Sequence, residues 1–260
     1  MTAATIPARA APPATPLVTL VVPVLDEELF LAETLASLRN QTFTDFELVV
    51  VDNGSTDRSP EIAKGFADKI VLEPRRGALH AMHRGFTEAR GELVACADAD
   101  TLYPPRWLER MVKALDAAGV VAVYGPMGFR ESRRPVRFLQ VLGNCALAGL
   151  SRLCGVRVAG AANLGMRNDA YFAVGGYPPL VERASPDFRL ALRLARIGRV
   201  RFAPSMVCYT SNRRFIRVNA LWGSLEALRY WFDVATRRDR IPGESYWAER
   251  EAGKRAGQRE

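Results

Sequence analysis

The first half of the chain alternates short apolar runs with segments of helical periodicity. Residues 17–24 (LVTLVVPV) and 46–51 (FELVVV) are rich in β-branched residues and apolar on both faces, as strands buried in a parallel sheet require. Between them, Leu31, Leu35 and Leu38 recur at i, i+4 and i+7, which places them on one face of a helix. This order of strand, helix and strand predicts a βαβ unit.

The same alternation continues to residue 124. We expect further helices over 59–67, 78–90 and 105–118, and further strands over 70–72, 92–97 and 120–124. This pattern predicts an α/β fold with a doubly wound, mostly parallel sheet and helices on both faces. In such a fold the ligand site lies at the carboxyl ends of the strands.

The alternation ends past residue 126. Residues 130–137 (RESRRPVR) predict an exposed loop, and the uncharged, mostly apolar stretch 138–151 follows it. One more helix is expected over 186–197, where Leu190 and Leu194 share a face. The apolar stretch is shorter than the about 20 residues that cross a bilayer, so we expect no membrane span.

Composition indicates a globular protein in a reducing compartment. The 48% of apolar residues in a chain of 260 can form a substantial core. The four cysteines are Cys96, Cys145, Cys154 and Cys208. They form no C-x-x-C pair, and each has apolar neighbours in the sequence. This pattern favours buried, reduced thiols and a cytoplasmic location. The first sixteen residues lack the basic start and apolar run of a signal peptide and predict a flexible tail.

The positive charge is concentrated late in the chain. Residues 1–180 carry 19 basic and 19 acidic side chains, whereas residues 181–260 carry 17 basic and 9 acidic ones, which accounts for the net charge of +8. A basic C-terminal third favours anionic partners, such as substrate phosphates, an acidic membrane surface or nucleic acid. An arginine-rich solvated surface with no partner is the alternative.

Acidic residues follow three of the predicted strands. PVLDEE (23–28) follows the first strand, Asp52 the second, and Asp98 and Asp100 the fourth. Because parallel strands end at the same edge of a sheet, we expect these groups to meet there. Two close carboxylates repel each other unless a cation lies between them, and Mg²⁺ or Mn²⁺ prefers such oxygen ligands. Aspartate is also common in ordinary turns, so the spacing alone leaves both interpretations open.

The order of these motifs resembles that of family 2 glycosyltransferases of the GT-A fold. PVLDEE, VVVDNGSTD and ACADADT are followed by VAGAANLGMRNDAYFAVGGY and SPDFRLALRLARIGRVRF, over roughly residues 17–215. The resemblance implies transfer of a sugar from a nucleotide-diphosphate sugar to an acceptor hydroxyl, with a divalent cation, Mg²⁺ or Mn²⁺, as cofactor. It also implies inversion at the sugar carbon and a single addition, because the Gln-x-x-Arg-Trp motif of processive synthases is missing.

The domain organisation follows from the same resemblance. We expect a nucleotide-sugar-binding half over 17–125 and an acceptor-side, catalytic-base half of the same domain over 126–241, which forms the C-terminal extension. Tails are expected over 1–16 and 242–260. The acceptor would be a glycan, a lipid or a small molecule, and the chain could lie peripherally at the inner face of an anionic membrane.

Five residues have roles in nucleotide binding that the resemblance implies. The backbone at Pro23 and Leu25 would border the nucleoside together with Glu27. Asp52 would accept hydrogen bonds from the base, as a carboxylate can. Arg76 would lie against the nucleotide. Each also has a structural alternative, because Asp52 begins a tight-turn sequence and Glu27 suits the first turn of a helix.

The remaining assignments concern the metal and the reaction. Asp98 would face the ribose or the metal, and Asp100 would bind the metal that bridges the diphosphate. Asp187 would be the catalytic base, although an Asp after Ser and Pro is also a good helix start. Arg213 and Arg214 would contact the diphosphate or an anionic acceptor, or only the solvent.

The sequence also departs from the family pattern. His83 stands where these enzymes often have Asn, which suggests a changed donor pocket. A late histidine that can complete the metal shell is missing near residues 207–210, so the third protein ligand stays open.

Two other functions remain open from the residues alone. A nucleotidyltransferase would share the fold, but PVLDEELF contains neither the Gly nor the Lys of its usual phosphate loop. A nucleic-acid-binding module would use the late arginines, but these lack an interleaved aromatic platform. We therefore expect no nucleic acid among the partners.

Overall fold

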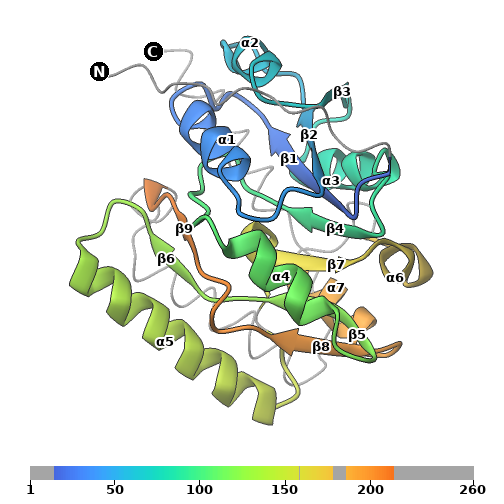
Figure 1. Ribbon diagram of the computed structural model, residues 1–260, viewed down its shortest axis with the longest axis vertical. Helices are drawn as coiled ribbons and strands as arrows, with labels where there is room; N and C mark the ends of the chain where they lie inside the picture. The colour runs from blue at the N-terminus through green and yellow to red at the C-terminus, as the bar shows by residue number, and fades with distance from the viewer. Residues whose placement is uncertain (1–14, 158, 178–185, 214–260) are drawn as a thin grey trace.

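The structure is a computed structural model that describes residues 15–157, 159–177 and 186–213. Its centre is a seven-stranded sheet in the order β3-β2-β1-β4-β7-β5-β8 (Figure 1). The strands are β1 (Val18–Val24), β2 (Phe46–Asp52), β3 (Lys69–Leu72), β4 (Leu93–Cys96), β5 (Val120–Tyr124), β7 (Leu164–Arg167) and β8 (Arg199–Phe202). All neighbouring strands pair in parallel except β7, which is antiparallel to both β4 and β5. The predicted mostly parallel α/β sheet is therefore confirmed.

Helices cover both faces of this sheet. One face is covered by α1 (Leu31–Arg39), α2 (Ser59–Lys64) and α4 (Trp107–Leu115), and the other by α3 (Ala78–Thr87), α6 (Asn168–Ala173) and α7 (Pro186–Leu194). Alternate strand residues supply the two cores, since Leu20 and Val22 of β1 join the first cluster and Val21 joins the second. Burial on both faces explains why these strands are continuously apolar.

The strand register brings the ends of β1, β2 and β4 to one rim. Val24 is level with Asp52 across β1 and β2, and Val21 is level with Cys96 across β1 and β4. Close packing of α3 against β1 supports this arrangement, because a Cβ on Gly85 would lie 2.2 Å from a methyl group of Val21. The acidic segments that follow these strands therefore start from the same edge of the sheet.

The second half differs from the sequence prediction in one segment. Residues 130–137 are not a single exposed loop, because the twenty-residue helix α5 begins at Arg134 and runs to Leu153. Pro135 explains the early start, since proline is favoured in the first turn of a helix. A two-stranded parallel ribbon, β6 (Met127–Phe129) with β9 (Cys208–Thr210), lies between α5 and the rest of the molecule (Figure 1).

The thiols are free but not all buried. Cys96 and Cys208 are buried in the core, whereas Cys145 is partly exposed and Cys154 is exposed. The prediction of burial is wrong for Cys154, because it ends α5, whose apolar residues face outward rather than into a core. Among the described residues, we find no helix long and apolar enough to cross a membrane. The predicted tails 1–16 and 242–260 lie almost wholly outside the described residues.

Candidate active site

The loop after β1 is held by the loop after β2. Asp26 has a positive φ of 53°, which is unusual for a residue other than glycine. Its carboxylate accepts hydrogen bonds from the backbone N–H of Thr56 at 2.8 Å and from the Thr56 hydroxyl at 3.2 Å. The backbone N–H of Glu27 donates to the Ser59 hydroxyl at 2.8 Å. These bonds fix the turn that carries Glu27, and Pro23 and Leu25 lie partly buried just before it.

The loop after β2 begins with Asp52 and Asn53. The Asp52 carboxylate accepts a hydrogen bond from the backbone N–H of Ser55 at 3.0 Å, so the tight turn expected as the structural alternative is present. Asn53 is buried, and its amide donates to the carbonyls of Glu73 and Arg75, both at 2.8 Å. Its side-chain oxygen accepts from the N–H of Gly77 at 2.7 Å.

Asn53 therefore fixes the loop that carries Arg76. Gly77 adopts a φ of 133° there, a conformation that favours glycine. Arg76 itself is exposed on this loop, next to the rim formed by the ends of β1 and β2. The position agrees with the expected nucleotide contact, which stays a prediction.

Asp100 lies just beyond β4 and is 2% exposed. The Arg213 guanidinium contacts one oxygen of this carboxylate, with its Nε at 3.1 Å and its NH2 nitrogen at 2.9 Å. The same guanidinium forms a salt bridge with the buried carboxylate of Glu27. It also lies 4.8 Å from the centre of the Phe30 ring, within cation–π distance. One cation thus joins the segments after β1 and β4 to the segment after β9.

Two further residues from the second half reach Asp100. The Thr210 hydroxyl lies 3.4 Å from its carboxylate, and the Arg130 guanidinium lies 3.4 Å from its backbone carbonyl. Arg130 also pairs with Glu33 and lies 5.2 Å from the centre of the Phe30 ring. The ribbon of β6 and β9 therefore closes one side of the acidic rim.

Asp98 and Asp187 approach the same short 3-10 helix, η1 (Ala161–Asn163). The backbone N–H of Asp98 donates to the Tyr103 hydroxyl at 3.0 Å, and that hydroxyl donates to the carbonyl of Ala162, also at 3.0 Å. The backbone N–H of Ala161, the first residue of η1, donates to the Asp187 carboxylate. The residues predicted as metal ligand and as catalytic base are therefore linked through η1.

Burial sets the acidity of Asp187. Removal of its carboxyl from water raises the pKa to about 6, although the hydrogen bonds from Tyr177 and from the backbone of Ala161 lower it. The Tyr177 hydroxyl donates to the carboxylate at 2.8 Å. A carboxylate with a pKa near 6 is a stronger base than an ordinary one and is still ionised at pH 7. Ser185, its predicted cap, lies outside the described residues.

His83 contacts aromatic residues of α6. Its Nδ1 lies 2.9 Å from the hydroxyl of Tyr171, which in turn accepts a hydrogen bond from the backbone N–H of Tyr177 at 3.1 Å. The tyrosine proton is thus available to Nδ1, which fits a neutral imidazole. Burial lowers the pKa of His83, and the charges of Arg75 and His80 lower it further.

The residues present fit a divalent cation that phosphate groups help to hold. Asp98 and Asp100 supply carboxylates, and a buried carboxylate such as that of Asp100 favours a nearby positive charge, here that of Arg213. Within the described ranges, His, Cys, Asp and Glu form no group of three that could hold a metal. Mg²⁺ is often held by one or two carboxylates, with water and substrate phosphates completing its shell.

Sequence reasoning found most of the acidic groups at this rim but missed their partners. The structure places Glu27, Asp100 and Arg213 in direct contact, whereas Arg214 lies outside the described residues. Phe30 and Asn53 were missed, although both lie within the quoted segments PVLDEELF and VVVDNGSTD. Thr210 and Arg130 carried no signal, because only folding brings them to Asp100.

Comparison with known proteins gives a family match. The model of the family described as Glycosyl transferase family 2 matches residues 19–172, more than half of the chain. This range contains the segments after β1, β2 and β4 as well as η1 and β7. The match favours glycosyl transfer over a nucleotidyltransferase or a nucleic-acid-binding module.

Related sequences include curated proteins of archaea and bacteria. Glycosyltransferase AglE of Haloferax volcanii is 28% identical over 177 residues, which are 63% of this chain and 56% of that protein. Undecaprenyl-phosphate 4-deoxy-4-formamido-L-arabinose transferase of Photorhabdus laumondii is 33% identical over 128 residues, 45% of this chain and 38% of that protein. The match thus spans about half or less of the length of these relatives.

Solved structures share the fold. A mannosyltransferase of Pyrobaculum calidifontis, in complex with GDP-Man and Mn²⁺, has a TM-score of 0.67 at 24% identity, covering 90% of this chain and 68% of its own. Glucosyl-3-phosphoglycerate synthase of Mycobacterium tuberculosis, in complex with Mn²⁺, UDP and glucosyl-3-phosphoglycerate, has a TM-score of 0.57 at 19% identity; the match covers 88% of this chain and 82% of that one.

Proposed function

Because the chain belongs to glycosyl transferase family 2, we propose that it transfers a sugar from a nucleotide-diphosphate sugar to an acceptor hydroxyl, with a divalent cation as cofactor. The observation that carries this proposal is that the backbone of Asp98, through Tyr103, and the carboxylate of Asp187 both connect to η1. The proposed metal ligand and the proposed catalytic base are thereby brought to the same short segment. The GDP-Man and Mn²⁺ bound to the mannosyltransferase of similar fold support the same assignment.

The donor lies in this proposal along the rim of β1, β2 and β4. The backbone at Pro23 and Leu25 borders the nucleoside with Glu27, and Asp52 accepts hydrogen bonds from the base. Arg76 contacts the nucleotide from the loop that Asn53 holds.

Asp100 and Asp98 would hold the cation beside the diphosphate. A bound cation would offset the negative charge that develops on the departing nucleoside diphosphate. Arg213, which contacts Asp100 in the structure, would then be placed to contact the diphosphate. In the same proposal Arg214, the next residue along the chain, contacts an anionic acceptor.

The reaction itself requires a base and a leaving group. Asp187 accepts the proton of the acceptor hydroxyl as that oxygen attacks the anomeric carbon of the sugar. A new carbon–oxygen bond forms while the bond between that carbon and the diphosphate oxygen breaks. Attack from the face opposite the leaving diphosphate inverts the configuration.

A binding experiment tests the donor half of this proposal. We expect UDP-, GDP- or dTDP-sugars to raise the melting temperature of the protein in the presence of Mn²⁺, because a ligand that binds only the folded state stabilises it. EDTA should remove the effect. Equal stabilisation with EDTA, or none with any donor of the panel, would reject the metal-dependent donor site.

The products distinguish glycosyl transfer from nucleotidyl transfer. With the stabilising donor and a mixture of glycan, lipid-phosphate and small-molecule acceptors, we expect release of nucleoside diphosphate and a glycosylated acceptor. A nucleotidyltransferase would instead release pyrophosphate in a second, parallel reaction that contains nucleoside triphosphate and sugar phosphate. Pyrophosphate release in that second reaction, without nucleoside diphosphate release in the first, would reverse the assignment.

A further inference from the structure

Helix α5 turns an apolar face away from the protein. Four leucines on this face are largely exposed, namely Leu139 at 63%, Leu142 at 53%, Leu150 at 61% and Leu153 at 84%. They recur at i, i+3, i+11 and i+14, which places them on one side of a helix of 3.6 residues per turn. The buried residues of α5 are the small Ala148 and Ser151. A surface helix normally has the opposite pattern, with its apolar side toward the core.

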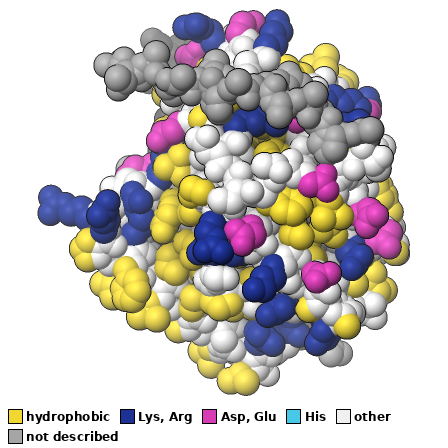
Figure 2. Space-filling model, in the orientation of Figure 1, with side chains coloured by type: hydrophobic (Ala, Val, Ile, Leu, Met, Phe, Trp, Pro, Cys, Tyr) yellow, Lys and Arg dark blue, Asp and Glu magenta, His cyan; other side chains and the backbone are white. Residues whose placement is uncertain are grey.

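Arginines border this apolar face. Arg134 and Arg152 lie at the two ends of α5 and are exposed, and Arg133 precedes its first turn. No Asp or Glu occurs between residues 132 and 168. Figure 2 shows hydrophobic and basic side chains together at the lower left, where α5 lies. The face therefore combines apolar surface with uncompensated positive charge.

This combination is typical of helices that lie in the interface of an anionic membrane. Such helices place apolar side chains at the level of the acyl chains while Lys or Arg contact the lipid headgroups. The twenty residues of α5 are about 30 Å long, which gives a broad contact parallel to the surface.

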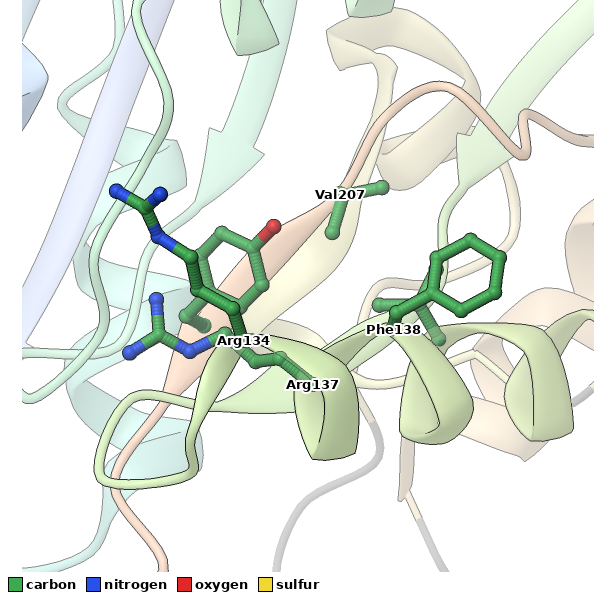
Figure 3. A pocket seen from close by; sticks show the side chains of 6 residues that line it. Arg134, Arg137, Phe138 and Val207 are labelled. Carbon is green, nitrogen blue, oxygen red and sulfur yellow. The ribbon is translucent and has the colours of Figure 1, made fainter.

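A hollow lies beside α5. It has a volume of about 440 Å³ and is lined by Phe138 and Val141 of α5 and by Val207 and Tyr209 across it. Figure 3 shows Arg134 and Arg137 beside this hollow, with Phe138 and Val207 around it. Tyr209 precedes Thr210, whose hydroxyl lies 3.4 Å from the Asp100 carboxylate. A surface in contact with α5 would therefore lie close to the candidate active site.

We propose that α5 docks the protein onto an anionic lipid surface, with its four exposed leucines at the level of the acyl chains and its arginines on the headgroups. The positive charge of the helix favours lipid over the other occupants of an apolar face. Residues 214–260 of the chain or a second copy of it are the competing occupants, and the experiment separates them. The proposal does not depend on the glycosyl transfer, because binding is measured without donor or acceptor.

Vesicle sedimentation with the full chain tests the docking. We expect binding to vesicles of phosphatidylglycerol and phosphatidylcholine, and little binding to phosphatidylcholine alone. Raising the salt from 0.1 M to 0.5 M should weaken binding by about tenfold, because the charge attraction is screened. Absence of binding to the anionic vesicles at 0.1 M salt overturns the proposal.

Matched variants locate the surface. The triple variant Leu139→Gln, Leu142→Gln, Leu150→Gln should weaken vesicle binding by about 100-fold, because it removes most of the inserted apolar area. The double variant Ile70→Gln, Leu72→Gln on β3 is the control, since both residues are exposed at the opposite end of the sheet. It should change binding less than about twofold. Equal effects of the two variants overturn the assignment to α5.

A fluorescent probe on Cys154 separates the occupants directly. This thiol is exposed at the end of α5, Cys96 and Cys208 are buried, and Cys145→Ser removes the partly exposed one. An environment-sensitive label there should shift to the blue when anionic vesicles are added. Sedimentation without a shift would show that another face binds lipid.

A label that is already blue-shifted without vesicles would show instead that residues 214–260 or a second copy cover α5. Light scattering over a range of protein concentrations then distinguishes these two occupants. Either result overturns the lipid proposal, whereas a monomer whose label shifts with vesicles supports it.

Discussion

The surroundings of Asp100 and Asp187 differ in how they balance a carboxylate that is withdrawn from water. Asp100, 2% exposed, has the Arg213 guanidinium at 2.9 Å and the Thr210 hydroxyl at 3.4 Å. Asp187 has the Tyr177 hydroxyl at 2.8 Å and a backbone N–H, both of which are neutral donors. Burial accordingly raises the pKa of Asp187 to about 6.

The difference matches two kinds of chemistry. A carboxylate that already binds a cation can exchange it for another, as a metal ligand must. A carboxylate that burial makes more basic can accept a proton near neutral pH, as a general base must. We therefore propose different roles for Asp100 and Asp187, and the following predictions test whether these roles are separate.

The largest effect is expected for Asp100→Asn. The amide keeps the size of the side chain but lacks the charge that holds a cation, so Mn²⁺-dependent binding of nucleoside diphosphate should be lost in calorimetry. The circular dichroism spectrum should stay native. Asp116→Asn is the control, because Asp116 is exposed at the end of α4. This variant should bind nucleoside diphosphate as the wild type does. Unaltered affinity in Asp100→Asn would remove Asp100 from the metal site.

The acidic residues at the rim of the sheet were largely predictable from the sequence. Asp52, Asp98 and Asp100 could be placed because each follows a strand whose apolar pattern is unambiguous, and parallel strands end at one rim. Arg213 was a candidate, but its contacts with Glu27 and Asp100 could not be predicted. They join residues 186 and 113 positions apart in the chain, and no local pattern encodes such a distance.

The second half of the chain was less predictable. The segment 130–137 carries four arginines, which suggested a loop, whereas Pro135 in fact starts a helix within it. The apolar run 138–151 was visible, but whether its leucines face a core or the solvent depends on what packs against α5. The basic strength of Asp187 likewise depends on burial and on Tyr177, which only the fold supplies.

The next largest effect is expected for Asp187→Asn. Turnover in a single-turnover transfer assay should fall by about 10²- to 10⁴-fold, because the amide cannot accept the proton. Donor affinity should stay within about twofold, since Asp187 contacts η1 and Tyr177 rather than the rim of β1 and β2. Unchanged turnover would make Asp187 a structural residue and place the base elsewhere.

The same variant has an expected effect on stability. The pKa of Asp187 is raised from 3.8 to about 6 in the folded protein, so the folded state binds more protons between these values. The ionisation of Asp187 therefore lowers the free energy of unfolding by up to about 3 kcal/mol as the pH rises from about 4 to 6. Asp187→Asn should remove this decline. Urea unfolding at pH 3.5 and pH 7 measures this decline. A loss of stability in Asp187→Asn at pH 7 alone would contradict a raised pKa of Asp187 in the folded protein.

A smaller effect is expected for Arg213→Gln. Removing the guanidinium leaves the carboxylates of Asp100 and Glu27 without their shared cation. In the absence of nucleotide, Mn²⁺ should then bind this variant at least about tenfold more tightly than the wild type. The reason is that the positive charge of Arg213, within about 4 Å of the Asp100 carboxylate, no longer competes with the cation. Calorimetry measures the affinity, and Arg106→Gln is the control because Arg106 is exposed and pairs with Glu109. Weaker Mn²⁺ binding would show that Arg213 supports the metal site instead of competing for it.

The smallest effect is expected for Tyr177→Phe. The Tyr177 hydroxyl lowers the pKa of Asp187 by its hydrogen bond to the carboxylate, so its removal should raise that pKa further above 6. A hydrogen bond to a charged group contributes about 1.5–3 kcal/mol, and the lower end of this range corresponds to about one pH unit, which is the shift that we expect here.

The pH dependence of transfer measures this shift. If Asp187 must be ionised to act as the base, kcat/KM rises with pH through about 6 in the wild type and through about 7 in Tyr177→Phe. Activity at pH 8 should change little, because both proteins are then ionised at Asp187. Tyr124→Phe is the matched control, since its buried hydroxyl has no hydrogen-bond partner in the described part of the chain. If kcat/KM rises at the same pH in Tyr177→Phe and in the wild type, and activity is lost at every pH, Tyr177 positions Asp187 without changing its pKa.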